Sequence, residues 1–511
     1  MYSYIGDPKN NIPTVFIILG ATGDLVSKKV MPALFNLFSD GRLPELFKII
    51  GFSRTEIGGE GFRDRVKNGL VHHFKSADVD SNKIEAFISH LDYQRSTFAD
   101  LNGYRSLSIK LEEVDQLWGL CSSKLLYLAT PPNSFEEILN NLSKSGLNKV
   151  CGGGGGWTRI ILEKPFGEDL KSARKLEKLL GKLFNESQIY RIDHYLAKEM
   201  TQNILSFRFS NNIFYPSWNK RFIERIKIRV LEENGVEERG NFYDNVGALK
   251  DFGPNHILQM LALVTMDHPV RFDAESIRKN RAKILSRLIN PSVDYIKKNT
   301  FRAQYKGYKS INGVRENSET ETYFKIKTFL NSTKFKGIPI ILESGKRMGK
   351  IRKDISIIFR HPTPCLCPGA NHYKNKIVIS LEPEEAITIQ FGSKKTGFNF
   401  ELEERFFGFN LYADAGDKIR SRAGESYEKL LLDCIAGDQT LFVSTQEIIS
   451  MWKFIDPIIR AWKDKSVELY YYKPDSSEAS DLSKNMIEEE TGIVNEDKVE
   501  INDQSLFPIQ K

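Results

Sequence analysis

The chain has few cysteines and no long apolar run, and these absences exclude several classes of protein. Five cysteines among 511 residues follow no regular spacing, which argues against a disulfide-stabilised secreted scaffold and favours a reducing compartment. No apolar stretch approaches the roughly 18–20 residues of a membrane span. Residues 1–13 also lack the apolar centre of a signal peptide. We therefore expect a cytoplasmic protein that has no membrane partner.

A large excess of charge of one sign is also missing. The chain has 73 Lys and Arg against 66 Asp and Glu, a net charge of +7. This is far below the charge density of a nucleic-acid-binding surface, and it is compatible with a small anionic substrate. With 41% hydrophobic and 27% charged residues, the composition is that of an ordinary globular protein. The length predicts two or three domains.

The first motif is a glycine turn between a strand and a helix. The continuous apolar run from Thr14 to Leu19 predicts a buried parallel strand, and residues 28–38 follow with helical spacing. The turn between them consists of Gly20, Ala21, Thr22, Gly23, Asp24 and Leu25. In this context the glycines let the backbone approach a pyrophosphate, which the helix N-terminus attracts. The usual third glycine is absent, and a plain turn after a strand is the alternative.

The end of the second predicted strand indicates which dinucleotide would bind. The apolar run at 48–52 is followed by Ser53 and Arg54. Proteins that prefer NAD commonly have an acidic residue here, which binds the ribose 2′-hydroxyl. A hydroxyl and a guanidinium suit a 2′-phosphate instead, so the sequence predicts NADP. The alternative is a surface arginine that happens to follow a strand.

Two more apolar runs extend the same predicted sheet. Residues 124–129 and 158–162 predict buried strands, and the second ends in Glu163, Lys164 and Pro165. Lys164 is thereby placed at the carboxyl edge of the sheet, where α/β folds bind ligands, and its bond to proline can be cis. A helix over 168–184 completes a Rossmann-type dinucleotide-binding domain over residues 1–190.

The densest group of polar side chains lies in residues 190–199. Residues 191–194 predict a strand that ends in a turn. In the helix predicted to follow, His194 and Lys198 would lie four residues apart on one face. Two neighbouring donors suit a phosphate, and Asp193 is free to orient a different group. A capped helix start with a solvated charged face is the alternative.

The pattern changes in the second half of the chain. Several β-branched or alternating runs are separated by turns and a few helices, which predicts a large, mostly antiparallel sheet. These runs cover residues 224–231, 322–330, 338–343, 354–360, 376–381 and 386–391. We therefore expect a larger α+β domain over residues 191–473. From residue 474 the composition becomes polar and acidic, which predicts a loosely ordered tail.

Two groups of histidines are candidates for functional sites. His256 is predicted on the first turn of an apolar helix, where a buried core histidine is the common alternative. A helix N-terminus favours the neutral imidazole that a general base requires. Cys365 and Cys367, near His361 and His372, lack the usual zinc spacing and lie in a proline-rich segment. No metal is therefore expected.

Residues 191–199, R-I-D-H-Y-L-A-K-E, resemble the signature R-I-D-H-Y-L-G-K-E of glucose-6-phosphate dehydrogenases, with Ala197 in place of glycine. The loop G-A-T-G-D-L, the segment E-K-P-F-G and the D-x-x-x-N-H that ends at His256 are similar to segments of the same family. The resemblance extends to about residue 470. It implies oxidation of D-glucose 6-phosphate at C1 to 6-phosphoglucono-1,5-lactone, with hydride transfer to NADP, in the pentose phosphate pathway.

The resemblance also implies roles for individual residues. His256 would be the catalytic base and Asp193 the residue that pairs with it. The substrate-binding residues implied in this way are Lys164, His194, Tyr195, Lys198, Glu232, Asp251 and Lys346, and Lys164 would also contact the cofactor. Glu382 departs from the family pattern, which normally has glutamine before Pro383. Five glycines at 152–156 resemble a flexible insertion.

Two further expectations concern assembly and activity. We expect a homodimer or homotetramer with a small-molecule substrate and no nucleic-acid partner. A catalytically inactive dinucleotide sensor of the same fold is the alternative function. The pair formed by Asp193 and His256, together with the phosphate-binding residues, argues against a sensor, because a sensor requires neither.

Overall fold

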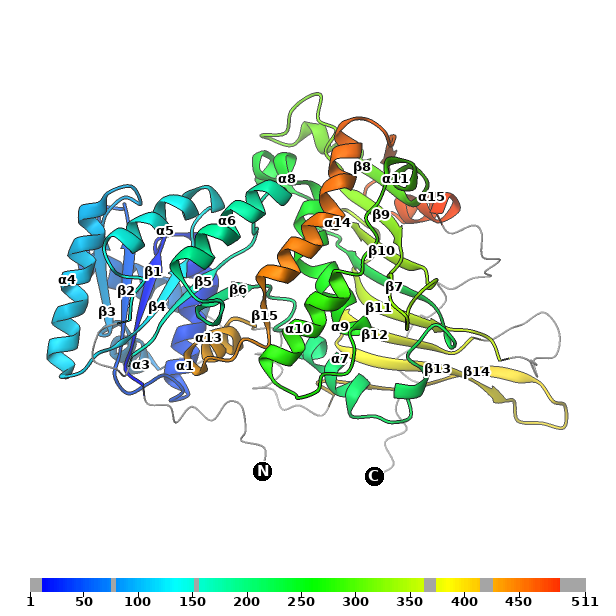
Figure 1. The fold of residues 1–511 in the computed structure, drawn as a ribbon, viewed down its shortest axis with the longest axis horizontal. Helices are drawn as coiled ribbons and strands as arrows, with labels where there is room; N and C mark the ends of the chain where they lie inside the picture. The colour runs from blue at the N-terminus through cyan, green and yellow to red at the C-terminus, as the bar shows by residue number, and fades with distance from the viewer. Residues whose placement is uncertain (1–11, 75–79, 151–155, 363–373, 414–425, 488–511) are drawn as a thin grey trace. The chain divides into compact units, whose positions relative to one another are not determined.

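The computed structural model describes residues 12–74, 80–150, 156–362, 374–413 and 426–487. The chain divides into two compact units, whose elements are labelled in Figure 1. The first unit comprises residues 1–198, 270–278 and 424–449, and the second comprises residues 199–269, 279–423 and 450–511. Glycines 152–155, Cys365, Cys367, His372 and the chain from residue 488 lie outside the described residues. No helix in the described part of the chain is long and apolar enough to cross a membrane.

The first unit contains a seven-stranded sheet in the order β15-β6-β5-β4-β1-β2-β3. Its strands are β1 (Thr14–Leu19), β2 (Phe47–Ser53), β3 (Leu91–Arg95), β4 (Ser123–Leu128), β5 (Thr158–Leu162), β6 (Ile189–Ile192) and β15 (Phe442–Val443). All pairs are parallel except that of β15 with β6. The order 3-2-1-4-5-6 is that of a doubly wound dinucleotide-binding fold. The predicted Rossmann-type fold is therefore confirmed.

The helices of this unit alternate with its strands along the chain, and some of them have capping residues at their ends. They are η1 (Val26–Val30), α1 (Met31–Ser39), α2 (Gly58–His73), α3 (Ser81–Ile88), α4 (Leu101–Trp118), η2 (Pro132–Ser134), α5 (Phe135–Lys144), α6 (Leu170–Leu183), η3 (Glu186–Gln188) and α13 (Ser426–Ala436). In α4, the Asp100 side chain accepts a hydrogen bond from the backbone of Asn102, and Gly119 ends the helix with a φ of 66°. In α6, Asp169 and Ser172 form a capping box. Helices α10 (Ala274–Leu285) and α14 (Thr445–Lys463) pass from the first unit to the second along the chain.

The second unit contains a nine-stranded sheet in the order β14-β13-β12-β11-β7-β10-β9-β8-β16. The strands are β7 (Ile223–Leu231), β8 (Thr300–Tyr305), β9 (Tyr323–Thr328), β10 (Ile340–Gly345), β11 (Arg352–Phe359), β12 (Lys376–Glu382), β13 (Ala386–Lys394), β14 (Leu402–Asn410) and β16 (Leu469–Tyr472). Only the pairs β7–β10 and β8–β16 are parallel within this sheet. The prediction of a mostly antiparallel sheet is thus confirmed. Its helices include α7 (Glu199–Phe209), α8 (Gly240–Phe252), η6 (Gly253–Ile257), α9 (Leu258–Thr265), α11 (Val293–Asn299) and α15 (Glu478–Ile487).

The structure differs from the predicted domain limits in three respects. The first unit continues to residue 198 rather than 190, and it also takes up the later segments 270–278 and 424–449. The polar segment after residue 474, expected to be loosely ordered, begins with the ordered helix α15. Ala479, Ser483 and Ile487 of this helix are buried, because their i, i+4, i+8 spacing places them on one face. Ser483 also lies 2.7 Å from the Tyr323 hydroxyl, so the helix belongs to the core of the second unit.

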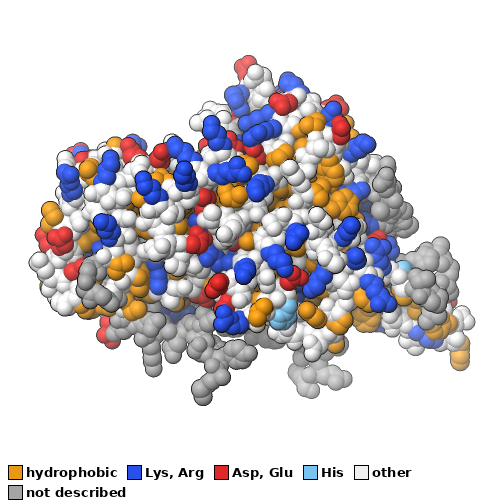
Figure 2. Space-filling model, viewed as in Figure 1, with side chains coloured by type: hydrophobic (Ala, Val, Ile, Leu, Met, Phe, Trp, Pro, Cys, Tyr) orange, Lys and Arg blue, Asp and Glu red, His pale blue; other side chains and the backbone are white. Residues whose placement is uncertain are grey.

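The surface carries charges of both signs. On the face drawn in Figure 2, lysine and arginine side chains are scattered over the surface with acidic side chains between them. This mixture of positive and negative side chains agrees with the small net charge of +7 over 511 residues.

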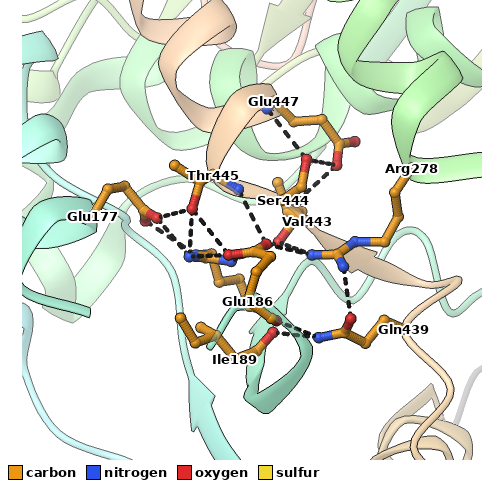
Figure 3. Close-up of polar contacts among 10 residues, drawn as sticks. Glu177, Glu186, Ile189, Arg278, Gln439, Val443, Ser444, Thr445 and Glu447 are labelled. Carbon is orange, nitrogen blue, oxygen red and sulfur yellow. Dashed lines mark hydrogen bonds and ion pairs between the residues drawn. The ribbon is translucent and has the colours of Figure 1, made fainter. Parts of the chain in front are cut away.

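A buried arginine network connects distant segments of the first unit. Arg191 of β6 has a side chain with 0% exposure, and its Nε and Nη2 donate to the two oxygens of Glu177 at 3.0 and 2.5 Å. Its Nη1 lies 2.9 Å from Glu186, and its Nη2 donates to the Thr445 hydroxyl at 2.8 Å. Figure 3 shows the surrounding carboxylates, with Arg278 also directed at Glu186. Burial alone would raise the pKa of Glu186, but the two arginines hold that pKa below its usual value. The network therefore fixes β6 immediately before Asp193.

Replacing Arg191 with methionine should destabilise the first unit strongly. Glu177, whose side chain is 4% exposed, would lose its cation, whereas Glu186 would keep its ion pair with Arg278. Leaving a buried charge without its partner typically costs about 3–5 kcal/mol. Urea unfolding of the parent and Arg191→Met measures this loss. The matched control is Arg95→Met, because the Arg95–Glu56 ion pair of the same unit is exposed and should contribute less than about 1 kcal/mol. Equal losses in the two variants would contradict a structural role for the network.

Candidate active site

The predicted nucleotide loop lies where the carboxyl ends of three strands meet. Gly20 has a φ of +88°, and a Cβ at this position would lie 2.5 Å from the backbone oxygen of Ala129, so only glycine fits here. The backbone N–H of Gly20 donates to Phe52 at 2.8 Å, and that of Gly23 donates to Gly20 at 3.0 Å. The loop after β1 thus contacts the ends of β2 and β4, at the point where the strand order reverses. This is where doubly wound folds bind nucleotides.

Three hydroxyl groups join the loop to the end of β2. The Thr22 hydroxyl lies 2.8 Å from that of Ser53 and 3.0 Å from that of Thr55, and the last two are 3.2 Å apart. Ser53 is 4% exposed, whereas Arg54 is exposed and forms no ion pair within the described ranges. Thr55 was not predicted from the sequence, because only the folded chain brings it to Thr22. The arrangement places an exposed arginine next to a hydrogen-bonded group of hydroxyls, which suits a 2′-phosphate.

The other predicted loop residues occupy different environments. Ala21 is buried and Leu25 is partly buried. Asp24 is exposed and pairs with Lys28 at 2.9 Å, a hydrogen bond and charge that lower the pKa of this carboxyl. The Asp24 side chain therefore stabilises the first helical turn.

Two features not predicted from the sequence fit NADP. Thr130, just after β4, has a buried hydroxyl that has no hydrogen-bond partner within the part of the chain that the structure describes. The Thr130 methyl carbon would lie 3.0 Å from a Cβ atom added at Gly20. The Thr130 side chain, including its hydroxyl, is therefore next to the nucleotide loop. Arg65 of α2 donates to the Thr22 backbone oxygen at 2.9 Å. A glycine loop, a buried hydroxyl without a partner and nearby cations are the groups that a phosphorylated dinucleotide requires.

Lys164 lies at the carboxyl end of β5, as predicted, and its peptide bond to Pro165 is cis. The preceding Glu163 accepts hydrogen bonds from the hydroxyls of Tyr127 at 2.6 Å and Tyr427 at 3.2 Å. Burial raises the pKa of Glu163, and these hydrogen bonds and the charge of Lys164 oppose the rise. The two tyrosines therefore fix the backbone that presents Lys164 at the edge of the sheet.

The segment after β6 is a pair of turns, and α7 begins only at Glu199. The prediction that His194 and Lys198 share a helical face is therefore wrong. Asp193 causes the difference, because its side chain accepts a hydrogen bond from the Tyr195 N–H at 3.0 Å, which favours a turn over a helix. Leu196 N–H then donates to the Asp193 backbone oxygen at 3.0 Å.

The turns nevertheless bring the predicted phosphate-binding side chains together. The rings of His194 and Tyr195 are 5.0 Å apart. The Lys198 ammonium lies 5.2 Å from the centre of the Tyr195 ring. A lysine, an imidazole and a phenol in one compact group can bind a phosphate through charge and hydrogen bonds.

His256 lies in the π-helical turn η6, between α8 and α9. The helical stretch continues from α8 into α9, so His256 is not at a free helix N-terminus, and the prediction that a helix dipole keeps it neutral is wrong. Pro254 does not end the helix, because it occupies the first turn of η6, where its missing N–H is tolerated. His256 is 1% exposed, and its ring lies 5.9 Å from that of Phe252.

Other predicted substrate residues of the second unit gather near the same phenylalanine. Glu232 follows β7 and Lys346 follows the parallel neighbour β10, and their side chains form an ion pair at 2.7 Å. The Lys346 ammonium is 5.4 Å from the Phe252 ring and 5.4 Å from the Tyr243 ring. Asp251 directly precedes Phe252. The pKa of Tyr243 lies well above its usual value, mainly because the side chain is buried and also because of the nearby negative charge of Asp251.

Asp193 belongs to the first unit and His256 to the second. Their pairing therefore stays a prediction, as do the roles of the individual site residues.

Comparisons with known proteins match both units. Residues 17–203 match the family model "Glucose-6-phosphate dehydrogenase, NAD binding domain", and residues 205–492 match "Glucose-6-phosphate dehydrogenase, C-terminal domain". The chain belongs to the glucose-6-phosphate dehydrogenase family.

Individual relatives support this membership over nearly the whole chain. A glucose-6-phosphate 1-dehydrogenase of Chlamydia pneumoniae is 37% identical over 495 residues, covering 93% of this chain and 94% of the relative. One from Aggregatibacter actinomycetemcomitans is 39% identical over 468 residues, covering 89% and 92%. A solved glucose-6-phosphate dehydrogenase in complex with glucose 6-phosphate has a TM-score of 0.84 at 30% identity, covering 95% and 99%. The predicted family, fold class, oxidoreductase activity and NADP cofactor are thereby confirmed.

In this dehydrogenase, Arg54→Ala should shift the choice of cofactor. A 2′-phosphate that loses a charge-assisted hydrogen bond should bind about ten- to a hundredfold more weakly, whereas NAD has no group there to lose. The ratio of kcat/KM for NADP to that for NAD measures the effect. Arg95→Ala, which removes an exposed arginine at the end of the neighbouring strand β3, is the control and should leave the ratio unchanged. An unchanged ratio in Arg54→Ala would identify Arg54 as an ordinary surface residue.

Proposed function

We propose that this chain oxidises D-glucose 6-phosphate at C1 to 6-phosphoglucono-1,5-lactone and reduces NADP. The observation that carries the proposal is the preserved chemistry of the family's motifs in folded form. The segment 193–198 gathers donors for a phosphate around Tyr195, and the second unit groups His256, Glu232 and Lys346 near Phe252. An inactive sensor has no use for either group.

The reaction requires a base for the C1 hydroxyl. We assign this role to His256, whose imidazole takes the hydroxyl proton as C1 loses its hydrogen with both bonding electrons. Asp193 orients the imidazole and stabilises the imidazolium that forms. NADP supplies the hydride acceptor when it is bound by the loop from Gly20 to Leu25 together with Ser53 and Arg54.

The remaining residues bind the sugar phosphate. His194, Tyr195 and Lys198 hold the phosphate by charge and hydrogen bonds. Lys164 and Lys346 flank the sugar, and Lys164 also contacts the cofactor. Glu232 and Asp251 accept hydrogen bonds from sugar hydroxyls. This arrangement of charges favours a phosphorylated hexose over glucose.

We also propose that the chain forms a homodimer or homotetramer in the cytoplasm. Support comes from the edge strand β14, where Phe407 and Phe409 are 67% and 41% exposed. Both lie on one face of the strand because they are two residues apart. Exposed aromatic side chains on an edge strand are typical of a surface that another chain covers.

His256→Asn tests the chemical step. The parent should reduce NADP in the presence of glucose 6-phosphate, measured by absorbance, and the variant should lose about 10²–10⁴-fold in kcat with little change in substrate binding. His268→Asn, which alters an exposed histidine of the same unit, is the control and should keep full turnover. A parent that binds NADP without ever reducing it would be the sensor. A His256→Asn enzyme with a third of normal turnover would exclude His256 as the base.

Lys198→Ala and His194→Ala test the phosphate group. Each should raise KM for glucose 6-phosphate by about tenfold or more, because a charged group contributes roughly 1.5–3 kcal/mol to such a hydrogen bond. KM for NADP and kcat/KM for unphosphorylated glucose should change little. Lys175→Ala removes an exposed lysine of the same unit as a control. Similar losses for glucose and its 6-phosphate would show that these residues do not bind phosphate.

A further inference from the structure

Four charged residues lie along one edge of the second unit's sheet. The neighbouring strands β12, β11, β7 and β10 contribute one residue each. Glu382 ends β12, and Lys353, near the start of the antiparallel strand β11, is its partner in the register. Glu232 follows β7, and Lys346 follows β10. Because adjacent strands bring these ends together, residues up to 150 positions apart in the chain form one row.

The charges in this row alternate in sign and are in contact. Lys353 lies 2.6 Å from Glu382 and 3.4 Å from Oε1 of Glu232. The other oxygen of Glu232, Oε2, lies 2.7 Å from Lys346. Both oxygens of Glu232 are therefore occupied by lysines, and Lys353 is shared between two carboxylates. We call these four residues the charge row.

The charge row is largely shielded from solvent. The side chains of Lys353 and Lys346 are 11% and 13% exposed, and those of Glu232 and Glu382 are 21% and 27% exposed. Charges in such positions interact more strongly than charges in water, and salt screens them less. The formal charges of the row, two positive and two negative, sum to zero, so removing one group changes the local charge by a full unit.

We propose that Lys353 and Glu382 determine how strongly the sugar site attracts an anionic substrate. This inference rests on the proposed function, in which Lys346 and Glu232 contact the sugar phosphate. Lys353 is a positioning residue that acts through Glu232. Because Lys353 attracts one oxygen of Glu232, the ion pair between Glu232 and Lys346 is weaker than it would be without Lys353. Lys346 is then available to the substrate. Glu382 acts in the opposite direction, because it competes with Glu232 for Lys353.

In the charge row, the departure from glutamine at position 382 has a functional consequence. An amide at position 382 would leave the row with one excess positive charge. The carboxylate of Glu382 removes that excess, so the two residues together adjust the preference for a hexose phosphate over an uncharged hexose. Lys353 was not predicted as a site residue, and Glu382 was singled out only as a departure from the family's glutamine at a presumed sugar contact.

Two single variants should change KM in opposite directions. Lys353→Met should raise KM for glucose 6-phosphate by about three- to tenfold, and Glu382→Gln should lower it by about threefold, with kcat within about twofold of the parent. Unphosphorylated glucose carries no charge, so its kcat/KM should change less than that for glucose 6-phosphate in either variant. A purely structural role would impair both variants in the same direction and for both sugars.

Further variants act as controls. Lys353→Met combined with Glu382→Gln restores the zero sum of charges, and its KM should lie between those of the two single variants. Glu384→Gln removes a nearby exposed carboxylate and should leave KM unchanged. Lys353→Arg keeps both ion pairs and should stay near the parent. If Lys353→Met does not fold, judged by thermal unfolding, the lower KM of Glu382→Gln still decides the question.

The result that overturns this inference differs from the result that overturns the proposed function. Lys346→Met should raise KM for glucose 6-phosphate if Lys346 contacts the substrate. If that KM is unchanged, the proposed sugar site is wrong. If Lys346→Met raises KM but Glu382→Gln does not lower it, the proposed function stands and the role of the charge row is refuted.

Discussion

A buried charge must be matched by partners of opposite sign, and much of the first unit is organised by this requirement. The Arg191 guanidinium is fully buried, so the large cost of its desolvation has to be offset by charged acceptors. Glu177 and Glu186 supply the negative charges, and Thr445 supplies a hydroxyl. These partners come from α6, η3 and the start of α14, so one side chain joins segments that are distant in sequence. Strand β6, which leads into the proposed phosphate-binding turns, is held in the middle.

Both units place their chemistry at one edge of a sheet, for different geometric reasons. In the first unit the strands are parallel, so the loops after β1, β2, β4 and β5 emerge at the same carboxyl edge. In the second unit, the ends of some strands lie beside the starts of their antiparallel neighbours, as for Glu382 and Lys353. The parallel arrangement provides backbone N–H groups and glycine turns for a dinucleotide. The antiparallel arrangement brings side chains of alternating charge together, and we propose that they contact the sugar phosphate.

The elements that could be predicted from the sequence are those whose signal is local. The strand at 14–19 is continuously apolar, and the strands of the second sheet alternate, so their patterns are explicit. Strand β3, L-D-Y-Q-R, is polar and lies at the edge of its sheet, and it was not predicted. The start of α7 was placed too early, because the side chain of Asp193 competes for a backbone N–H that a helix would need. Arg191 and Thr445 are 254 positions apart in the chain. No local sequence pattern around either residue predicts their hydrogen bond.

Glu382 shows why a motif position cannot be interpreted without its neighbours. Taken alone, a carboxylate in place of an amide adds a negative charge near a site for an anion, which should weaken binding. The structure places a lysine 2.6 Å away, and this lysine also contacts Glu232 at 3.4 Å. The added negative charge of Glu382 is therefore paired with a neighbouring positive charge. In our proposal, Glu382 affects the substrate only because it shares Lys353 with Glu232. Because the four charges act as a unit, the effect of any one residue depends on whether the other three are present.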